Sequence, residues 1–171
     1  MIIYGPQFVF RMKPMTRNIK IRAATEDDFP IVLSLIKELA ALEKAPREAV
    51  KNSVEQMKKE KGIFHCLLAE TGDGAIAGMA VYFFAYFTWV GKSLYLDDIF
   101  VKEKFRKRNI GTSLLLRIFE VARAEGCKRV RWQVLKWNRP AIEFYRKHGA
   151  EINDEWLNCT FSSEGIENCM P

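Results

Sequence analysis

The stretch that decides the fold is Leu94-Tyr95-Leu96-Asp97-Asp98-Ile99-Phe100-Val101, followed after a basic loop by Arg106-Lys107-Arg108-Asn109-Ile110-Gly111-Thr112. Its first part predicts a strand that ends at Val101, and the apolar spacing after Gly111 predicts a helix that stops at Gly126. Free N–H groups and the dipole at such a helix start favour an anion. The five cations of the loop strengthen that interpretation, which fits a pyrophosphate: Lys102, Lys104, Arg106, Lys107 and Arg108.

The basic loop also has two other interpretations. Its cations could simply be solvated, or they could form a nucleic-acid patch. The run is short, contains Glu103 and lacks the interleaved aromatic residues of a single-strand binder, so we expect no nucleic-acid partner.

The rest of the chain predicts strands and helices in one mixed sheet. Thr25 is the expected N-cap of the first helix, and Pro140 falls in the first turn of the last one. We expect strands over 19–23, 64–70, 75–86, 93–101, 129–135 and 156–161, and helices over 25–44, 47–61, 111–126 and 138–147. This order predicts an α/β (α+β) fold with helices flanking the sheet.

Length and composition suit one folded domain. The 171 residues include twelve Phe, five Tyr and four Trp that need burial, and no apolar run reaches the ~18 residues of a membrane span. We therefore expect a domain over 19–171 after an extension over 1–18, to which we assign no chemistry.

The four cysteines form no C-x-x-C pair, which favours reduced thiols in a cytoplasmic protein and no metal site. A two-disulfide secreted domain is the alternative. The net charge of +6 suits solubility or an anionic ligand.

Two motifs resemble those of the GNAT family of N-acetyltransferases. The segment from Arg106 to Gly111 looks like the family's Arg/Gln-x-x-Gly-x-Gly/Ala, with Asn109 in place of the first glycine. Asn tolerates the left-handed conformation well, so we expect the loop to survive. Asn138-Arg139-Pro140-Ala141, with Tyr145 and Gly149 after it, looks like Asn-x-x-Ala-x-x-x-Tyr-x-x-x-Gly.

The resemblance extends over residues 19–161 to the diamine (spermidine/spermine) acetyltransferase branch. Thr88-Trp89-Val90-Gly91 and Val134-Leu135-Lys136-Trp137-Asn138 look more like the thialysine acetyltransferases of that branch. The resemblance to this branch implies a single-domain GNAT fold with a mixed, mostly antiparallel sheet. It also implies acetyl-CoA as co-substrate and no metal. The implied cofactor-binding residues are Ile99, Phe100, Val101, Arg106, Lys107, Arg108, Asn109, Ile110, Gly111, Thr112, Asn138, Ala141 and Tyr145.

The resemblance also implies catalytic roles. A lysine-like amine has a pKa of about 10.4, so only about one molecule in a few thousand is neutral at pH 7, and a base must accept its proton. Asp97 is the candidate base, through water, where the branch usually has Glu. Tyr145 is the candidate acid for the leaving thiolate, although a core tyrosine is the alternative. The implied substrate-side residues are Leu42, Glu43, Trp89, Asp97 and Asp98.

Two of these roles have alternatives. Asp98 is either a second base or a structural acid, and Trp89 either stacks on a cation or only packs. Polyamine enzymes carry an acid shortly before this Trp. Phe87 and Thr88 stand there instead, which favours a small amino-acid-like amine.

The function expected is acetyl transfer from acetyl-CoA to a primary amine of a small molecule, a thialysine-like amino acid or a diamine or polyamine, by direct attack in a ternary complex. The alternatives are acetylation of protein or peptide amines, and a non-catalytic GNAT-like module that binds CoA or nucleic acid. The branch also implies a homodimer.

Overall fold

The computed structural model describes residues 18–169, and the expected extension over 1–18 lies outside the described residues except for Asn18. The chain forms two compact units, one ending at Trp132 and the other beginning at Gln133. Each is described by itself below, and a single domain over 19–171 stays a prediction.

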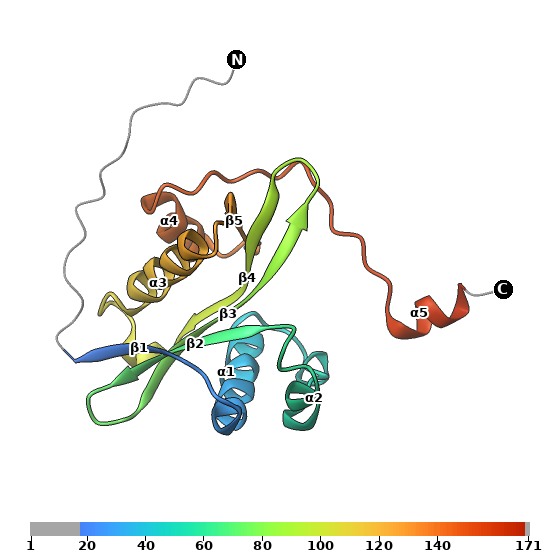
Figure 1. The fold of residues 1–171 in the computed structure, drawn as a ribbon. Coiled ribbons are helices and arrows are strands. Elements are labelled where there is room, and N and C mark those ends of the chain that lie inside the picture. The colour runs from blue at the N-terminus through green and yellow to red at the C-terminus, as the bar shows by residue number, and fades with distance from the viewer. Residues whose placement is uncertain (1–17, 170–171) are drawn as a thin grey trace, which may run out of the picture. The chain divides into compact units, whose positions relative to one another are not determined.

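A five-stranded sheet is the centre of the first unit (Figure 1). Its order follows the chain, and neighbouring strands are antiparallel except β4 and β5, which are parallel. The predicted mixed, mostly antiparallel sheet is therefore confirmed. The strands are β1 (Ile19–Ala23), β2 (His65–Thr71), β3 (Ile76–Phe87), β4 (Gly91–Val101) and β5 (Arg129–Arg131).

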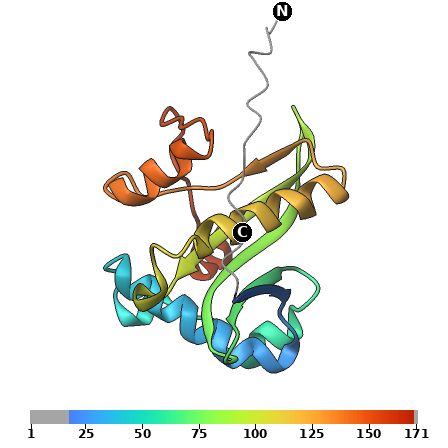
Figure 2. The same ribbon diagram turned by 90° about the vertical axis from the view of Figure 1, so that its left-hand side faces the viewer.

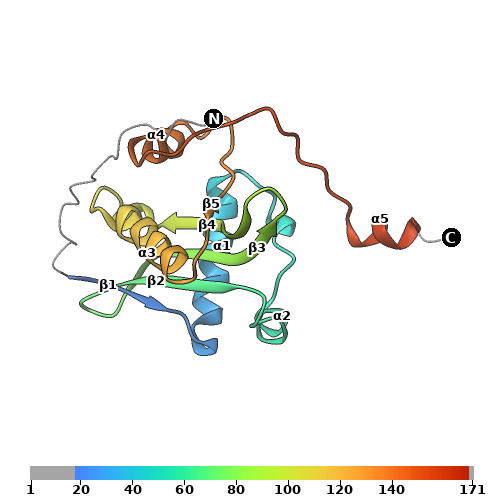
Figure 3. The same ribbon diagram turned by 45° about the horizontal axis from the view of Figure 1, so that its top comes forward.

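Helices cover both faces of this sheet (Figures 2 and 3). On one face, α1 (Phe29–Leu42) and α2 (Val54–Lys59) bury side chains such as Val32, Leu35 and Met57 against Leu68 and Val81 of the sheet. On the other face, α3 (Ile110–Ala124) contributes several fully buried side chains. Each fully buried Leu, Ile or Val stabilises the fold by roughly 1.5–3 kcal/mol. Short 3-10 turns lie at η1 (Glu26–Asp28), η2 (Arg47–Ala49) and η3 (Glu103–Phe105).

The ends of the long helices follow their sequence signals. The Thr25 N–H donates to the Asp28 carboxylate at 2.8 Å, and Arg22 donates two hydrogen bonds to that carboxylate. The hydrogen bonds from Arg22, more than its positive charge, hold the pKa of Asp28 well below its usual range. Gly126 ends α3 with φ +67, where its lack of a Cβ makes the left-handed turn easy, so this predicted stop is confirmed.

The second unit contains α4 (Arg139–Lys147) and α5 (Ser163–Asn168). The predicted helix at α4 is confirmed, but the strand predicted over 156–161 is wrong. That segment has no ladder partner within its described unit, and a strand cannot form alone. Its large apolar side chains are exposed: Trp156, Leu157 and Phe161.

Two other predicted elements are shorter than expected. The helix predicted over 47–61 begins only at Ser53, whose side chain accepts a hydrogen bond from the Gln56 N–H, and η2 takes up its first residues. The strand predicted over 129–135 ends at Arg131, where its pairing with β4 ends.

Candidate active site

A β-bulge places Asp97 at an irregular point of β4. Asp98 pairs with Val81 and Leu96 pairs with Tyr82, so Asp97 is an extra residue with no partner on β3. A bulge interrupts the strict alternation of side chains and re-aims the residues beside it. The bulge thus lets two consecutive carboxylates serve one site, although an ideal strand would turn them to opposite faces.

Glu43, at the end of α1, completes what we call the acidic cluster: Glu43, Asp97 and Asp98. Burial, first, and the negative charges of Asp97 and Glu43 raise the pKa of Asp98 to about 6. Burial also raises the pKa of Glu43 and that of Asp97. Part of the Asp97 side chain is exposed to solvent, and the rest lies against neighbouring protein atoms. Such a cluster stabilises a cation and can accept a proton near neutral pH.

The end of α1 explains why Glu43 lies there. The Ala45 N–H donates to the Ala40 carbonyl at 2.9 Å and the Lys44 N–H to the Ala41 carbonyl at 3.1 Å, which is a Schellman motif. Lys44 takes the left-handed conformation with φ +61, where glycine is usual. The motif ends the helix directly after Leu42 and leaves Glu43 as its C-cap.

One edge of β4 is open beside this cluster. The pairing of β4 with β5 ends at Tyr95 and Arg131, whereas β4 continues to Val101. Over residues 96–101 this edge pairs with no other strand in the described part of the chain. Alternate N–H and C=O groups of an open edge are available to an extended ligand. The predicted cofactor-binding residues Ile99, Phe100 and Val101 lie on this stretch.

The basic loop that follows makes a sharp, strained turn. Asn109 is left-handed with φ +59, as predicted, and Lys107 is left-handed as well with φ +60. The Asn109 side chain makes no capping hydrogen bond to α3. The first hydrogen bond of the helix runs from the Ser113 N–H to the Asn109 carbonyl. The N–H groups of Ile110 and Gly111 therefore have no acceptor in a preceding turn and can donate to an anion.

The cations of the loop have different surroundings. Arg106 Nε donates to the Val101 carbonyl at 3.1 Å, which ties the loop to the end of β4. Arg108 lies over the ring of Phe105. Lys107 is exposed.

Lys107→Gly should stabilise the protein. A left-handed non-glycine residue costs about 1–2 kcal/mol, and part of the gain is offset by the greater freedom of glycine in the unfolded chain. We expect the free energy of unfolding in urea to rise by about 0.5–1 kcal/mol. Asn109→Gly is the matched control and should gain less, because Asn tolerates this conformation. A Lys107→Gly variant less stable than the wild type would contradict the strain.

Three predicted site residues belong to the second unit. Asn138 caps α4, and its side-chain oxygen accepts a hydrogen bond from the Ala141 N–H at 3.3 Å. Tyr145 is 7% exposed, and its ring meets Phe144 edge-on at 5.3 Å. Their roles toward a cofactor or a leaving group stay predictions.

The structure does not bring Trp89 to the acidic cluster of its own chain. Trp89 lies in the turn between β3 and β4 and is 89% exposed. Asp97 comes six positions after Gly91 on β4, and at about 3.3 Å per position this is roughly 20 Å. Leu42, in contrast, directly precedes Glu43 and is 45% exposed. A substrate-side role of Trp89 stays a prediction.

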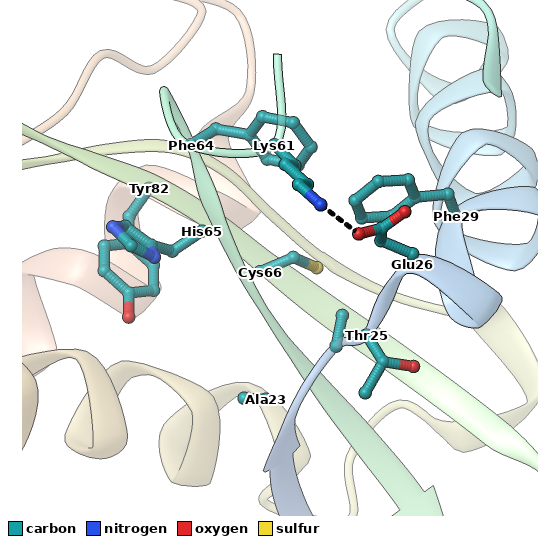
Figure 4. Close-up of a pocket in the computed structure, with 10 residues that line it drawn as sticks. Ala23, Thr25, Glu26, Phe29, Lys61, Phe64, His65, Cys66 and Tyr82 are labelled. Atoms are coloured by element: carbon teal, nitrogen blue, oxygen red, sulfur yellow. Dashed lines mark hydrogen bonds and ion pairs between the residues drawn. The ribbon is translucent and has the colours of Figure 1, made fainter. Parts of the chain in front are cut away.

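A separate cavity of about 340 Å³ opens near the ends of β1 and β2 (Figure 4). Lys61 and Glu26 form an ion pair at 2.6 Å at its edge. Cys66 lines it, but burial raises the pKa of this thiol to about 12, so it is not a nucleophile at neutral pH. No predicted site residue lines this cavity.

Among residues 18–169, no helix is long and apolar enough to cross a membrane. Within the same range, no three His, Cys, Asp or Glu side chains are grouped to hold a metal ion.

The chain is similar to known acetyltransferases in sequence and in fold. Residues 25–150 match the acetyltransferase (GNAT) family. Thialysine N-epsilon-acetyltransferase of Mus musculus is 35% identical over 163 residues, 87% of this chain and 95% of that protein. The Bos taurus enzyme of the same name is 38% identical over 162 residues, 86% and 95% of the two chains. A metagenomic aminoglycoside acetyltransferase from an uncultured soil sample has the same fold, with a TM-score of 0.70 at 20% identity over 84% of this chain and 95% of that one.

Proposed function

Because the chain belongs to the acetyltransferase (GNAT) family and is an N-acetyltransferase, we propose that it acetylates a primary amine of a small molecule, a thialysine-like amino acid or a diamine or polyamine. The acidic cluster is the observation that carries this proposal. Three carboxylates beside the open edge of β4 suit a cationic amine. The relatives named for thialysine support the same class of substrate.

The loop and the open strand edge supply the acetyl-CoA side of the proposal. The N–H groups at the start of α3, with the cations around them, bind the pyrophosphate. The backbone of Ile99, Phe100 and Val101 binds the pantetheine arm. One N–H of this stretch stabilises the oxyanion that forms at the thioester carbonyl. Asn138 and Ala141 line the other side of the arm.

The reaction needs one proton acceptor and one proton donor. Asp98 and Glu43 hold the ammonium, and Asp97 accepts its proton through water. The neutral nitrogen attacks the thioester carbon, the C–N bond forms, and the C–S bond breaks. Tyr145 gives its proton to the leaving thiolate, and its phenolate is reprotonated by the second proton, which the acylated nitrogen releases as the amide forms. Burial raises the pKa of Asp97, and this supports the first step because a carboxylate with a raised pKa accepts a proton more readily.

A panel of amines tests this function. Purified protein and acetyl-CoA are mixed with thialysine, lysine or spermidine, and the free thiol of CoA is measured over time. We expect amine-dependent release of thiol with at least one of them, well above hydrolysis without amine. Thiol release at the hydrolysis rate with every amine would contradict the proposal.

We also propose that the protein is a cytoplasmic homodimer. The family branch supports the dimer, and the four cysteines, all free thiols, support a reducing compartment. Light scattering of the purified protein should give twice the mass of one chain. The mass of a single chain would contradict the dimer.

A further inference from the structure

Two arginines of β5 lie on the same face of the sheet as the acidic cluster. Phe87 comes six positions after Val81 on β3, an even step, and Val81 belongs to the core under α1, so Phe87 points to that face. The guanidinium groups of Arg129 and Arg131 lie over the Phe87 ring, 4.4 and 5.4 Å from its centre. Asp98, which pairs with Val81, senses the charge of Glu43 at the end of α1.

These arginines carry positive charge that no carboxylate neutralises. Neither of them forms an ion pair with any residue in the described range 18–169. Arg129 Nε is buried and has no hydrogen-bond partner there. Stacking on an aromatic ring fixes the plane of a guanidinium and leaves its N–H fork free for a planar anion. A carboxylate is the ligand that this fork matches best.

An apolar floor connects the arginines to the acidic cluster. Phe83 and Tyr95 stack with ring centres 5.0 Å apart, and Phe83 shares the face of Val81 and Phe87. Tyr95 is close to both the acidic and the basic groups. Burial raises the pKa of Tyr95 most, the negative charge of Asp97 raises it further, and the positive charge of Arg131 lowers it. An aliphatic chain that lies on these rings would have one end at each charge.

The arginines and the acidic cluster lie at different points along β4. Arg131 pairs with Tyr95, and Asp97 follows two residues later, so the Cα atoms of Arg131 and Asp97 are about 8 Å apart. Arg131 also leans toward Phe87, which pairs with Gly91, and so points away from Asp97. Arg131 and Asp97 form no ion pair in the described range, so a ligand that contacts both charges needs an aliphatic stem between its anionic and its cationic end.

We propose that Arg131, with Arg129 beside it, binds the α-carboxylate of an amino acid whose side-chain ammonium lies at the acidic cluster. This inference rests on the proposed function and selects amino acids with a terminal amine, such as lysine, thialysine or ornithine, over diamines and polyamines. It makes Arg131 a specificity-determining residue of the amine site.

The test compares one amino acid with its decarboxylated counterpart. Arg131→Met removes the charge and keeps much of the bulk, Arg131→Lys keeps the charge without the fork, and Arg117→Met, on the exposed side of α3, is the matched control. Rates are measured with lysine and with cadaverine. We expect Arg131→Met to raise KM for lysine by about ten- to hundredfold, the effect of one charge-assisted hydrogen bond, with kcat little changed. KM for cadaverine should stay the same or fall.

The outcomes separate the inference from the proposed function. An equal loss for both amines in Arg131→Met, or no loss for either, would overturn the carboxylate site while the acetyltransferase activity stands. A wild type that acetylates no amine would instead contradict the proposed function. If Arg131→Met does not fold by circular dichroism, Arg131→Lys decides, because it should raise KM for lysine by a smaller factor and leave KM for cadaverine unchanged. The same KM for lysine as in the wild type would overturn the inference.

Discussion

Asp98→Asn should lower kcat/KM by about 10²- to 10³-fold and at the same time stabilise the fold. The loss follows because the ammonium loses the most buried charge of the acidic cluster, and truncating one partner of a buried charge pair costs about 2–5 kcal/mol. The gain follows because burial and neighbouring carboxylates disfavour the ionised form of Asp98 in the folded state. We expect the free energy of unfolding at pH 7 to rise by about 1–2 kcal/mol, measured in urea.

The pH dependence has the corresponding sign. The folded-state pKa of Asp98 is about 6, above its ordinary value of 3.8, so the folded protein binds this proton more readily than the unfolded chain. Stability from this group is therefore fully present below pH about 4 and is lost as pH rises through about 6. Activity should have the opposite pH dependence to stability. As pH decreases through about 6, Asp98 takes up a proton and loses its negative charge, so kcat/KM should fall.

The matched control is Asp27→Asn, which removes an exposed carboxylate from η1. It should change neither kcat/KM by more than about twofold nor the unfolding free energy by more than about 0.5 kcal/mol. An Asp98→Asn variant that is less stable than the wild type, or equally active, would show that Asp98 is a structural acid.

Tyr145→Phe should lower kcat by about 10²- to 10³-fold and leave the affinity for acetyl-CoA within about twofold. The change removes only the hydroxyl oxygen, so the buried ring keeps its packing against Phe144. A thiolate that leaves without a proton donor is the poorer leaving group, and general acids contribute 10²–10⁴-fold. Steady-state rates give kcat, and calorimetry gives the Kd for acetyl-CoA.

Tyr86→Phe is the matched control for the loss of a hydroxyl. Tyr86 lies near the end of β3 and is 78% exposed, so its variant should keep wild-type kcat. Equal losses of kcat and of acetyl-CoA affinity in Tyr145→Phe would mean that Tyr145 binds the cofactor and does not donate the proton.

Local periodicity predicted most of the fold. The alternation in β1 and the helical spacing in α1 and α3 are strong local signals, and Gly126 marks its helix end by its own backbone freedom. Asn109 could be assigned to a left-handed turn because its residue type tolerates one. Lys107 and Lys44 could not, since lysine gives no such signal and the surrounding structure imposes the conformation.

The composition of the site depended on contacts between distant segments. The sequence contains no sign of the bulge at Asp97, because an extra residue is defined only by the partner strand. The approach of Glu43 to Asp98 needs α1 to end at the correct place over the sheet. The position of Arg131 over Phe87 needs the parallel register of β4 and β5. The strand predicted over 156–161 failed for the same reason, since its β-prone residues have no partner in their described unit.

The most direct test of the account follows the acetyl group itself. Protein, isotope-labelled acetyl-CoA and lysine are mixed, and mass spectrometry measures the label on the amine and on the intact protein. We expect one labelled acetyl-amine for each CoA released, and no label on the protein, because the amine attacks the thioester directly. Label that accumulates on the protein, or CoA release without acetylated amine, would contradict it.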